Sequence, residues 1–244
     1  MRVLFDQINT ITMTNEDSNY PIENSQTPYQ GQVTKATGKA STFSLDINNN
    51  GNAIFLGNTN AETGVLRVYD PGLVETIPFV IDHRDTIIGI MQGTERQGFI
   101  EDWELYTYIS TAHALEIDLT TTESILHIGI IKAGFADHFT NPNYGWSQNI
   151  IDTSIKNETN IGATYVLNRS KLREFSGDFI AYPKNDFYKF QDLYYKLQNQ
   201  STAFYFVDDG TSSRQMCFGK LGQPSSSFPS FEIGNWSINI REEL

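Results

Sequence analysis

Hydrophobic and polar residues alternate along most of this chain with a period of two. Phe43, Leu45 and Ile47 alternate with polar neighbours, and Trp103 and Leu105 begin a second alternating run that ends at Ile109. Such alternation is typical of β-strands with one face buried and the other in water. Further strands are expected at Arg2–Phe5, Ile8–Met13, Ala53–Leu56, Val65–Tyr69, Thr76–Ile81, Thr86–Met91, Leu115–Leu119 and Leu126–Ile131. Short strands separated by turn-forming residues such as Asp70–Gly72 indicate a β-sandwich or barrel.

One segment near the C-terminus has the period of a helix instead. Pro183 ends a strand pattern, Asn185 is expected as the N-cap, and Asp186 suits the positive end of a helix. The apolar stripe consists of Phe187, Phe190, Leu193, Tyr194 and Leu197. A helix of about thirteen residues needs a surface to pack on. The strands expected to supply that surface are Ala203–Val207, Gln215–Leu221 and Trp236–Ile240.

These patterns divide the chain into two β domains. Residues 1–140 form the expected sandwich, and residues 161–244 form a small antiparallel sheet with one helix at about 185–198. Between them, residues 141–160 are expected to be a linker or arm, because turn formers and aromatic residues are interleaved from Phe139 to Trp146. The fold class is therefore mainly β.

Charge and cysteine content narrow the function classes. The net charge is −12, from 17 basic and 29 acidic residues, and no run of basic residues offsets it. Direct binding to nucleic acid or to an anionic membrane surface is therefore not expected. Cys217 is the sole cysteine, so no intramolecular disulfide is expected. The first residues are charged at once, which is not expected of a signal peptide.

One segment begins like a calcium-binding loop. Asp46, Asn48 and Asn50 place oxygen donors at positions one, three and five, and Gly51 occupies position six. A loop of this type needs a bidentate Glu at position twelve, but that position is Gly57. Strand patterns flank the segment on both sides, so a polar hairpin turn is the preferred interpretation.

The remaining candidate residues do not form a catalytic pattern. His83, His113, His127 and His138 lack metal-ligand spacing, and His127 lies in an apolar run typical of a core histidine. Cys217 lies in an expected strand, as a buried and inert thiol would. The carboxylate neighbours are Glu101 with Asp102, and Asp208 with Asp209. Adjacent strand residues point to opposite faces, so neither pair converges on one substrate. We assign no catalytic, cofactor-binding or metal-ligating residue, and we expect neither a cofactor nor an enzyme.

The order of several segments resembles a known fold family. Tyr20-Pro21-Ile22-Glu23-Asn24 precedes Ser44–Ile47, Ala53–Asn60 and Val65–Tyr69, which is similar to the galactose-binding-like (discoidin-type) jelly-roll sandwich. The variant that it most resembles occurs in virion structural proteins of tailed bacteriophages. Segments 134–146, 173–179 and 204–208 are similar to the C-terminal part of those phage proteins.

The resemblance implies a structural component of a bacteriophage tail: a ring, adaptor or fibre-attachment platform. Such a protein would contact itself in a symmetric ring and would also contact other tail proteins, with tail fibres as a further expected partner. It would reside in the virion after assembly in the host cytoplasm. The alternative is a carbohydrate-binding module of a receptor-binding apparatus. For that role Tyr29, Tyr144 and Trp146 could stack on sugars, and Asn15, Glu16 and Asp17 form a polar early loop. An enzyme acting on polysaccharide is a third possibility, since carboxylates can also converge from distant strands.

Overall fold

The computed structural model divides the chain into two compact units that interleave in sequence. It describes residues 2–27, 32–47, 53–70, 72–80, 96–100, 114–139, 147–152, 154–158, 164–167, 171–198, 200–205, 216–228 and 232–243. The first, here called the sandwich unit, comprises Met1–Asp85, Thr94–Asn141 and Thr202–Phe218. The second, called the helix unit, comprises Thr86–Gly93, Pro142–Ser201 and Gly219–Leu244.

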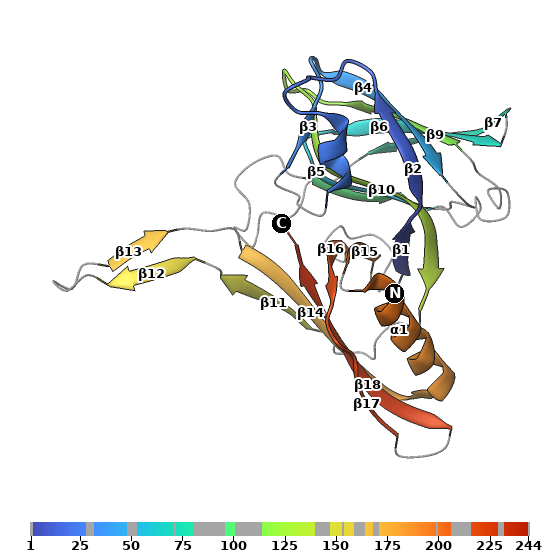
Figure 1. The fold of residues 1–244 in the computed structure, drawn as a ribbon, viewed down its shortest axis with the longest axis vertical. Helices are drawn as coiled ribbons and strands as arrows, with labels where there is room; N and C mark the ends of the chain where they lie inside the picture. The colour runs from blue at the N-terminus through green and yellow to red at the C-terminus, as the bar shows by residue number, and fades with distance from the viewer. Residues whose placement is uncertain are drawn as a thin grey trace. The chain divides into compact units, whose positions relative to one another are not determined.

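Two antiparallel sheets make up the sandwich unit (Figure 1). The first has the order β2-β4-β9-β6-β7, and the second has the order β15-β1-β10-β5-β8 with β3 beside β10. The strands are β1 (Arg2–Asp6), β2 (Ile8–Met13), β3 (Thr34–Lys35), β4 (Ala40–Ile47), β5 (Ala53–Thr59), β6 (Thr63–Asp70), β7 (Gly72–Val80), β8 (Arg96–Ile100), β9 (Ala114–Thr120), β10 (His127–His138) and β15 (Ser201–Tyr205), and a 3₁₀ helix, η1 (Ile22–Gln26), precedes β3.

The chain crosses repeatedly from one sheet to the other. β4 lies in the first sheet, β5 in the second and β6 in the first again, and the later strands β8, β9 and β10 alternate in the same way. Alternation of this kind is the connectivity of a jelly-roll sandwich. It also corrects one expectation, because β4 and β5 belong to different sheets and cannot form the hairpin predicted around Asn48–Gly51. The expectation that Asp70–Gly72 separates two strands is confirmed, because β6 ends and β7 begins there and the two strands pair.

The core lies between the two sheets. Phe43, Leu45 and Ile47 of β4 are buried there, as their alternation predicted. The second sheet is covered on both faces: Ile54 and Leu56 face the main core, whereas Phe55 joins a cluster of Leu4, Ile130 and Phe218. Burial on both faces explains the unbroken apolar run in β5, because neither side of that strand meets water.

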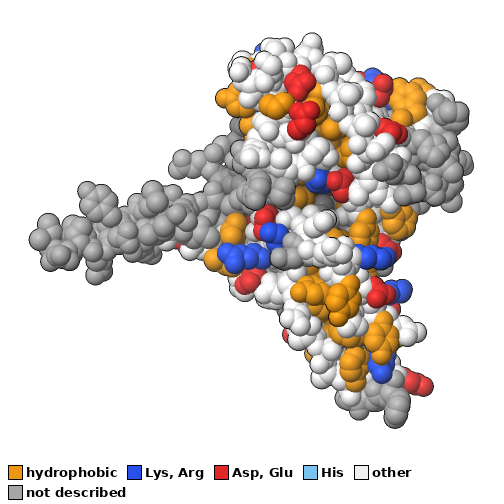
Figure 2. All heavy atoms as spheres, viewed as in Figure 1, with side chains coloured by type: hydrophobic (Ala, Val, Ile, Leu, Met, Phe, Trp, Pro, Cys, Tyr) orange, Lys and Arg blue, Asp and Glu red, His pale blue; other side chains and the backbone are white. Residues whose placement is uncertain are grey.

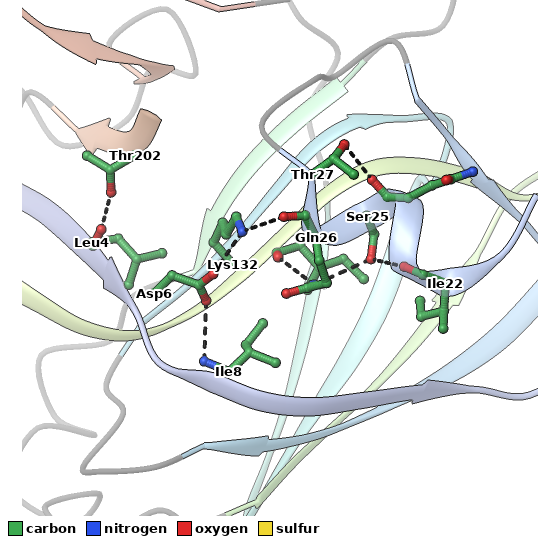
Figure 3. A network of polar contacts seen from close by, with 11 residues as sticks. Leu4, Asp6, Ile8, Ile22, Ser25, Gln26, Thr27, Lys132 and Thr202 are labelled. Carbon is green, nitrogen blue, oxygen red and sulfur yellow. Dashed lines mark hydrogen bonds and ion pairs between the residues drawn. The ribbon is translucent and has the colours of Figure 1, made fainter. Parts of the chain in front are cut away.

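Polar side chains join strands of the second sheet to one another and to η1 (Figure 3). The Lys132 ammonium donates to the Asp6 carboxylate at 2.8 Å and to the Gln26 carbonyl oxygen at 3.1 Å. The Gln26 amide donates to the Ile131 carbonyl oxygen at 3.1 Å, and the Thr202 hydroxyl donates to the Leu4 carbonyl oxygen. Residues from the beginning, middle and end of the chain therefore meet in this one sheet.

The helix unit consists of an antiparallel sheet with a single helix among the described residues (Figure 1). Its strand order is β11-β14-β18-β16, with β17 beside β18, and β16 up to Phe218 is counted in the sandwich unit. Among the described residues, β12 pairs with β13 in a separate two-stranded sheet. The elements are β11 (Ser147–Asp152), β12 (Ile155–Glu158), β13 (Thr164–Leu167), β14 (Lys171–Pro183), α1 (Lys184–Leu197), β16 (Met216–Leu221), β17 (Ser225–Ser227) and β18 (Ile233–Glu242).

Aromatic side chains fix α1 on this sheet. Phe179 of β14 stacks on Trp236 of β18 at 5.2 Å between ring centroids, and Phe190 of the helix lies 5.1 Å from Phe179. Phe187, Leu193 and Leu197 complete the buried stripe, so the predicted helix and its apolar face are confirmed. The predicted N-cap is wrong, because Pro183 occupies that position, while the Lys184 backbone N–H donates to the Glu232 carbonyl oxygen.

The compact units differ from the contiguous division into 1–140, 141–160 and 161–244. The expected linker contains β11, which pairs with β14 in the sheet of the helix unit, and it also contains β12. Residues 202–218, expected in the second domain, belong to the sandwich unit. These residues lie in the sandwich unit because β15 pairs with β1, about 200 positions earlier in the sequence. Which segments fold independently stays a prediction.

Candidate functional site

The polar early loop singled out in the sequence uses its own carboxylates internally. The Glu16 carboxylate accepts a hydrogen bond from the Ile22 backbone N–H at 2.6 Å. The Asp17 carboxylate accepts from the backbone and side-chain nitrogens of Asn19. Asn15 has a left-handed backbone, with φ at 56°, and its carbonyl oxygen accepts from Thr37. These three residues shape the loop, and both carboxylates among them already accept hydrogen bonds.

The early loop is one of four connections at the same end of the sandwich unit. Segments 14–27, 36–39, 60–62 and 121–126 lie there, because β2, β5 and β9 end at this edge while β4, β6 and β10 begin there. Asn60 joins two of these connections. Its amide nitrogen donates to the Glu123 carboxylate at 2.9 Å and to the Ile125 carbonyl oxygen at 2.8 Å, and its amide oxygen accepts from the His127 N–H.

An aromatic ring and three ionisable groups gather beside these connections. The Lys35 ammonium lies 3.8 Å from the centroid of the Tyr20 ring, and Lys35 is paired with His127 across β3 and β10. Burial lowers the pKa of His127, Lys35 lowers it further, and the carboxylate of Glu123 acts in the opposite direction. Tyr20 is 38% exposed, so its ring is accessible. We call Tyr20, Lys35, Glu123 and His127 the loop-end cluster.

The loop-end cluster has the chemistry needed to hold a neutral polar ligand. An exposed aromatic ring can stack on an apolar face, while an ammonium and a carboxylate can donate to and accept from hydroxyl groups. The sequence had placed His127 in the core as a satisfied histidine, and the structure finds it half-buried. Tyr20 and Lys35 were not selected from the sequence, because their contact depends on the fold of residues 14–35.

A second polar group lies on the outer face of the first sheet. Arg67 of β6 forms ion pairs with Asp118 and, at 3.7 Å, with Glu116 of β9. The Tyr69 hydroxyl donates to Glu116 at 2.7 Å, and the Thr42 hydroxyl donates to Asp118 at 2.7 Å. Hydrogen bonds from Arg67 and Thr42, together with the charge of Arg67, keep the pKa of Asp118 below its usual value, whereas donation to Glu116 raises the pKa of Tyr69.

This outer-face network borders a shallow depression of about 530 Å³. Its lining residues are Thr63, Gly64, Val65, Pro78, Phe79, Asp118 and Thr120. Asp118 is held ionised by its partners, so it is poorly suited to donate a proton near neutral pH. Both carboxylates of this network are therefore paired with a cation on the neighbouring strand. Cross-strand pairs of opposite charge stabilise a sheet, so these carboxylates have a structural role.

The helix unit presents a different surface (Figure 2). Hydrophobic side chains gather over α1 and the strands beside it. The exposed ones include Tyr188 and Tyr195 of α1 and Phe228 after β17. Lys184 places its ammonium 5.0 Å from the Phe228 ring centroid and 5.8 Å from that of Tyr188. Aromatic side chains are enriched at protein interfaces, so these exposed rings make this surface a candidate interface.

Several candidates from the sequence lie outside the described residues or side chains. These are Tyr29, His83, Glu101, Asp102, His113, His138, Tyr144, Trp146, Asp208, Asp209 and Cys217. The calcium-like segment is described only at its flanks, where Asp46 accepts a hydrogen bond from the Asn9 amide at 3.0 Å. Within the described part of the chain, no three His, Cys, Asp or Glu residues are grouped as a metal site would need. No described helix is long and apolar enough to cross a bilayer.

Comparison with known proteins gives only weak likenesses. No family model matches the chain, and no curated protein does. The N-terminal domain of the single-strand break repair protein XRCC1 is similar with a TM-score of 0.38 and 12% identity, over 55% of this chain and 99% of that one. A lectin-binding domain of lectinolysin complexed with Lewis b is similar with a TM-score of 0.36 and 10% identity, over 51% and 90%.

A third similar structure is truncated AlyQ with CBM32 and alginate lyase domains. The TM-score is 0.39 at 13% identity, over 74% of this chain and 49% of that one, so this chain spans about half of its length. Similarities of this size do not identify a ligand or a reaction for this chain. The strand pairing shows directly that the chain is mainly β, with a sandwich in the first unit and a helix-covered antiparallel sheet in the second.

Proposed function

We propose that this chain is a non-catalytic structural protein that acts through protein–protein interfaces, as a component of a bacteriophage tail. The observation that carries the proposal is the exposed aromatic surface of the helix unit. Tyr195 is 63% exposed and Tyr188 is 44% exposed, although both lie on an ordered helix held by a buried aromatic core. Exposed aromatic side chains on a rigid element are typical of surfaces that bind another protein.

Support for the tail assignment comes from the sequence order that resembles phage virion proteins. Several of the described charged groups of this chain are paired with one another, as in Arg67 with Asp118 and Arg173 with Glu242. Paired groups of this kind stabilise a scaffold and leave little free acid–base chemistry.

The proposal is tested by mass spectrometry of purified virions from the phage whose genome encodes this chain. The chain should be found at a fixed ratio to the major tail proteins, and it should co-sediment with tails separated from heads. Purified virions that lack the polypeptide would refute the proposal.

A second candidate function is carbohydrate binding at the loop-end cluster. The specific observation in its favour is the exposed Tyr20 ring, with the Lys35 ammonium beside it and His127 opposite Lys35. A sugar ring could stack where Tyr20 is open to solvent while its hydroxyl groups bond to Lys35 and Glu123.

A glycan array with the whole chain tests this second function. Binding to a defined glycan that is lost in Tyr20→Ala and kept in Tyr195→Ala would support it, because both variants remove an exposed tyrosine but only the first alters the loop-end cluster. An array without binding, or binding that survives Tyr20→Ala, would refute it.

A further inference from the structure

Net charge is divided very unevenly between the two units. The sandwich unit contains 8 basic and 20 acidic residues, which gives it the whole net charge of −12. The helix unit contains 9 basic and 9 acidic residues and is therefore neutral overall. Two sandwich units brought together would repel each other, whereas two helix units would not. Contacts between copies of this chain are thus favoured at the helix unit.

The helix unit also has the surface that such a contact needs. Tyr188 and Tyr195 project from α1, with Lys189 and Asp192 exposed between them, and Phe228 lies beside the start of the helix. We call these five residues the α1 face. Phe187 packs edge-on against Phe228 at 5.3 Å and lies 6.0 Å from the Tyr188 ring, so these two exposed rings rest on a buried aromatic side chain. They are consequently held in place before any partner binds, which lowers the entropy lost on association.

We propose that the α1 face is the surface through which two copies of this chain bind each other. A contact with two-fold symmetry requires a surface that is complementary to itself. The α1 face meets this requirement, because an antiparallel pairing of two α1 helices can place Lys189 of each copy near Asp192 of the other while the tyrosines pack together. The inference deepens the proposed structural function by naming a partner, a second copy, and the residues that contact it.

The charge division gives this contact a distinctive dependence on salt. The acidic sandwich units repel over a distance set by the Debye length, about 30 Å at 0.01 M salt and about 8 Å at 0.15 M. Raising the salt concentration screens that repulsion, while contacts between aromatic rings are not weakened by it. Self-association should therefore become tighter as sodium chloride increases, the reverse of an interface held by opposite charges.

The test is sedimentation velocity of the full chain at low and at high sodium chloride, over a range of protein concentrations. The wild-type chain should self-associate, and more tightly at high salt. In the double variant Tyr188→Ser/Tyr195→Ser, the dissociation constant should rise about tenfold for each ring removed. Leu73→Ser is the matched control, since Leu73 is 57% exposed on β7 of the sandwich unit, and it should leave the association unchanged.

Far-ultraviolet circular dichroism of all variants is the control for folding. The spectra should be superimposable because both tyrosines are exposed. A wild-type chain that stays monomeric at every salt and protein concentration would overturn the inference, as would a double variant that associates like the wild type. Association that weakens with salt would also overturn it. The virion assay remains separate: a monomeric chain found in virions would leave the proposed function intact, and a self-associating chain absent from virions would leave the α1 face intact.

Discussion

Replacing Glu242 by glutamine should destabilise the helix unit strongly, although the two side chains have nearly the same shape. Glu242 at the end of β18 and Arg173 of β14 form an ion pair whose side chains are 0% and 4% exposed. The Arg173 guanidinium donates to both carboxylate oxygens at 2.7 to 3.2 Å, and its backbone N–H donates to the same carboxylate at 3.0 Å. Glu242→Gln removes the negative charge and turns one acceptor into a donor that faces Arg173.

The size of the effect follows from the burial of the pair. Leaving one member of a buried ion pair without its countercharge costs about 3–5 kcal/mol in the free energy of unfolding. Glutamine keeps the shape and one acceptor oxygen, so we expect a loss near the lower end, about 3 kcal/mol. For a chain of this length each kcal/mol lowers the melting temperature by about 2–4 °C, which gives a fall of about 6–12 °C for the transition that includes this unit.

Urea denaturation followed by circular dichroism measures the loss, and three variants make the result specific. Arg173→Met should be destabilised as strongly as Glu242→Gln, because it takes the guanidinium away from a buried carboxylate. The double variant Arg173→Met/Glu242→Leu should lose much less than the sum of the two single changes, since it leaves no buried charge. A loss below about 1 kcal/mol in Glu242→Gln, or losses that simply add in the double variant, would refute the reasoning.

Three further changes test other parts of the structure. Asn60→Ala should lower the free energy of unfolding by about 2 kcal/mol, measured by urea denaturation, because it removes a buried amide that makes three hydrogen bonds. Phe190→Ala should cost about 3–5 kcal/mol in the same assay, because it opens a cavity between α1 and the sheet. For His127 the folded pKa is lowered, so its contribution is present above the unfolded value of 6.5 and is lost as the pH falls through the folded pKa. His127→Asn should therefore show a shallower decline in stability than the wild type as the pH falls below about 6.5.

A specific outcome would contradict each of these three predictions. Asn9→Ala is the control for Asn60→Ala, since Asn9 is exposed, and its effect should stay within about 0.5 kcal/mol; equal losses in the two variants would contradict the buried role of Asn60. A loss below about 1 kcal/mol in Phe190→Ala would mean that the helix is not held by its buried ring. If the free energy of unfolding falls with pH equally steeply in the wild type and in His127→Asn, protonation of that histidine does not contribute to the decline.

The elements were well predicted where one local period decides them. Phe43, Leu45 and Ile47 alternate because β4 has one buried face, and Phe187, Phe190 and Leu197 recur because α1 has one. In both cases the side-chain period is a property of a single element, so no knowledge of neighbouring elements is needed.

What could not be predicted depends on partners that are distant in the sequence. β15 joins β1 from the other end of the chain, so residues 202–218 lie in the sandwich unit and not with the neighbouring residues of the sequence. The pairing of Arg67 with Asp118 had a partial signal, since Arg67 and Tyr69, like Glu116 and Asp118, share a strand face at a spacing of two. Only the register between β6 and β9 brings the two pairs together, and sequence does not supply that register.

The hairpin expected after β4 failed for a related reason. Turn residues between two strand patterns indicate a change of direction, and they do not indicate whether the second strand returns to the same sheet. In this chain β5 enters the opposite sheet, which is the crossing that builds the sandwich. The hairpin was therefore a wrong prediction, because β4 and β5 do not pair with each other.

The measurement that tests the central claim most directly is quantitative mass spectrometry of virions assembled in cells that supply either the wild-type chain or Tyr188→Ser/Tyr195→Ser. Our account predicts the wild-type chain at a constant number of copies per virion, and a strong depletion of the double variant although it folds and accumulates normally. Virions that contain neither form would contradict the proposed tail function, and virions that contain both forms in equal amounts would contradict assembly through the α1 face.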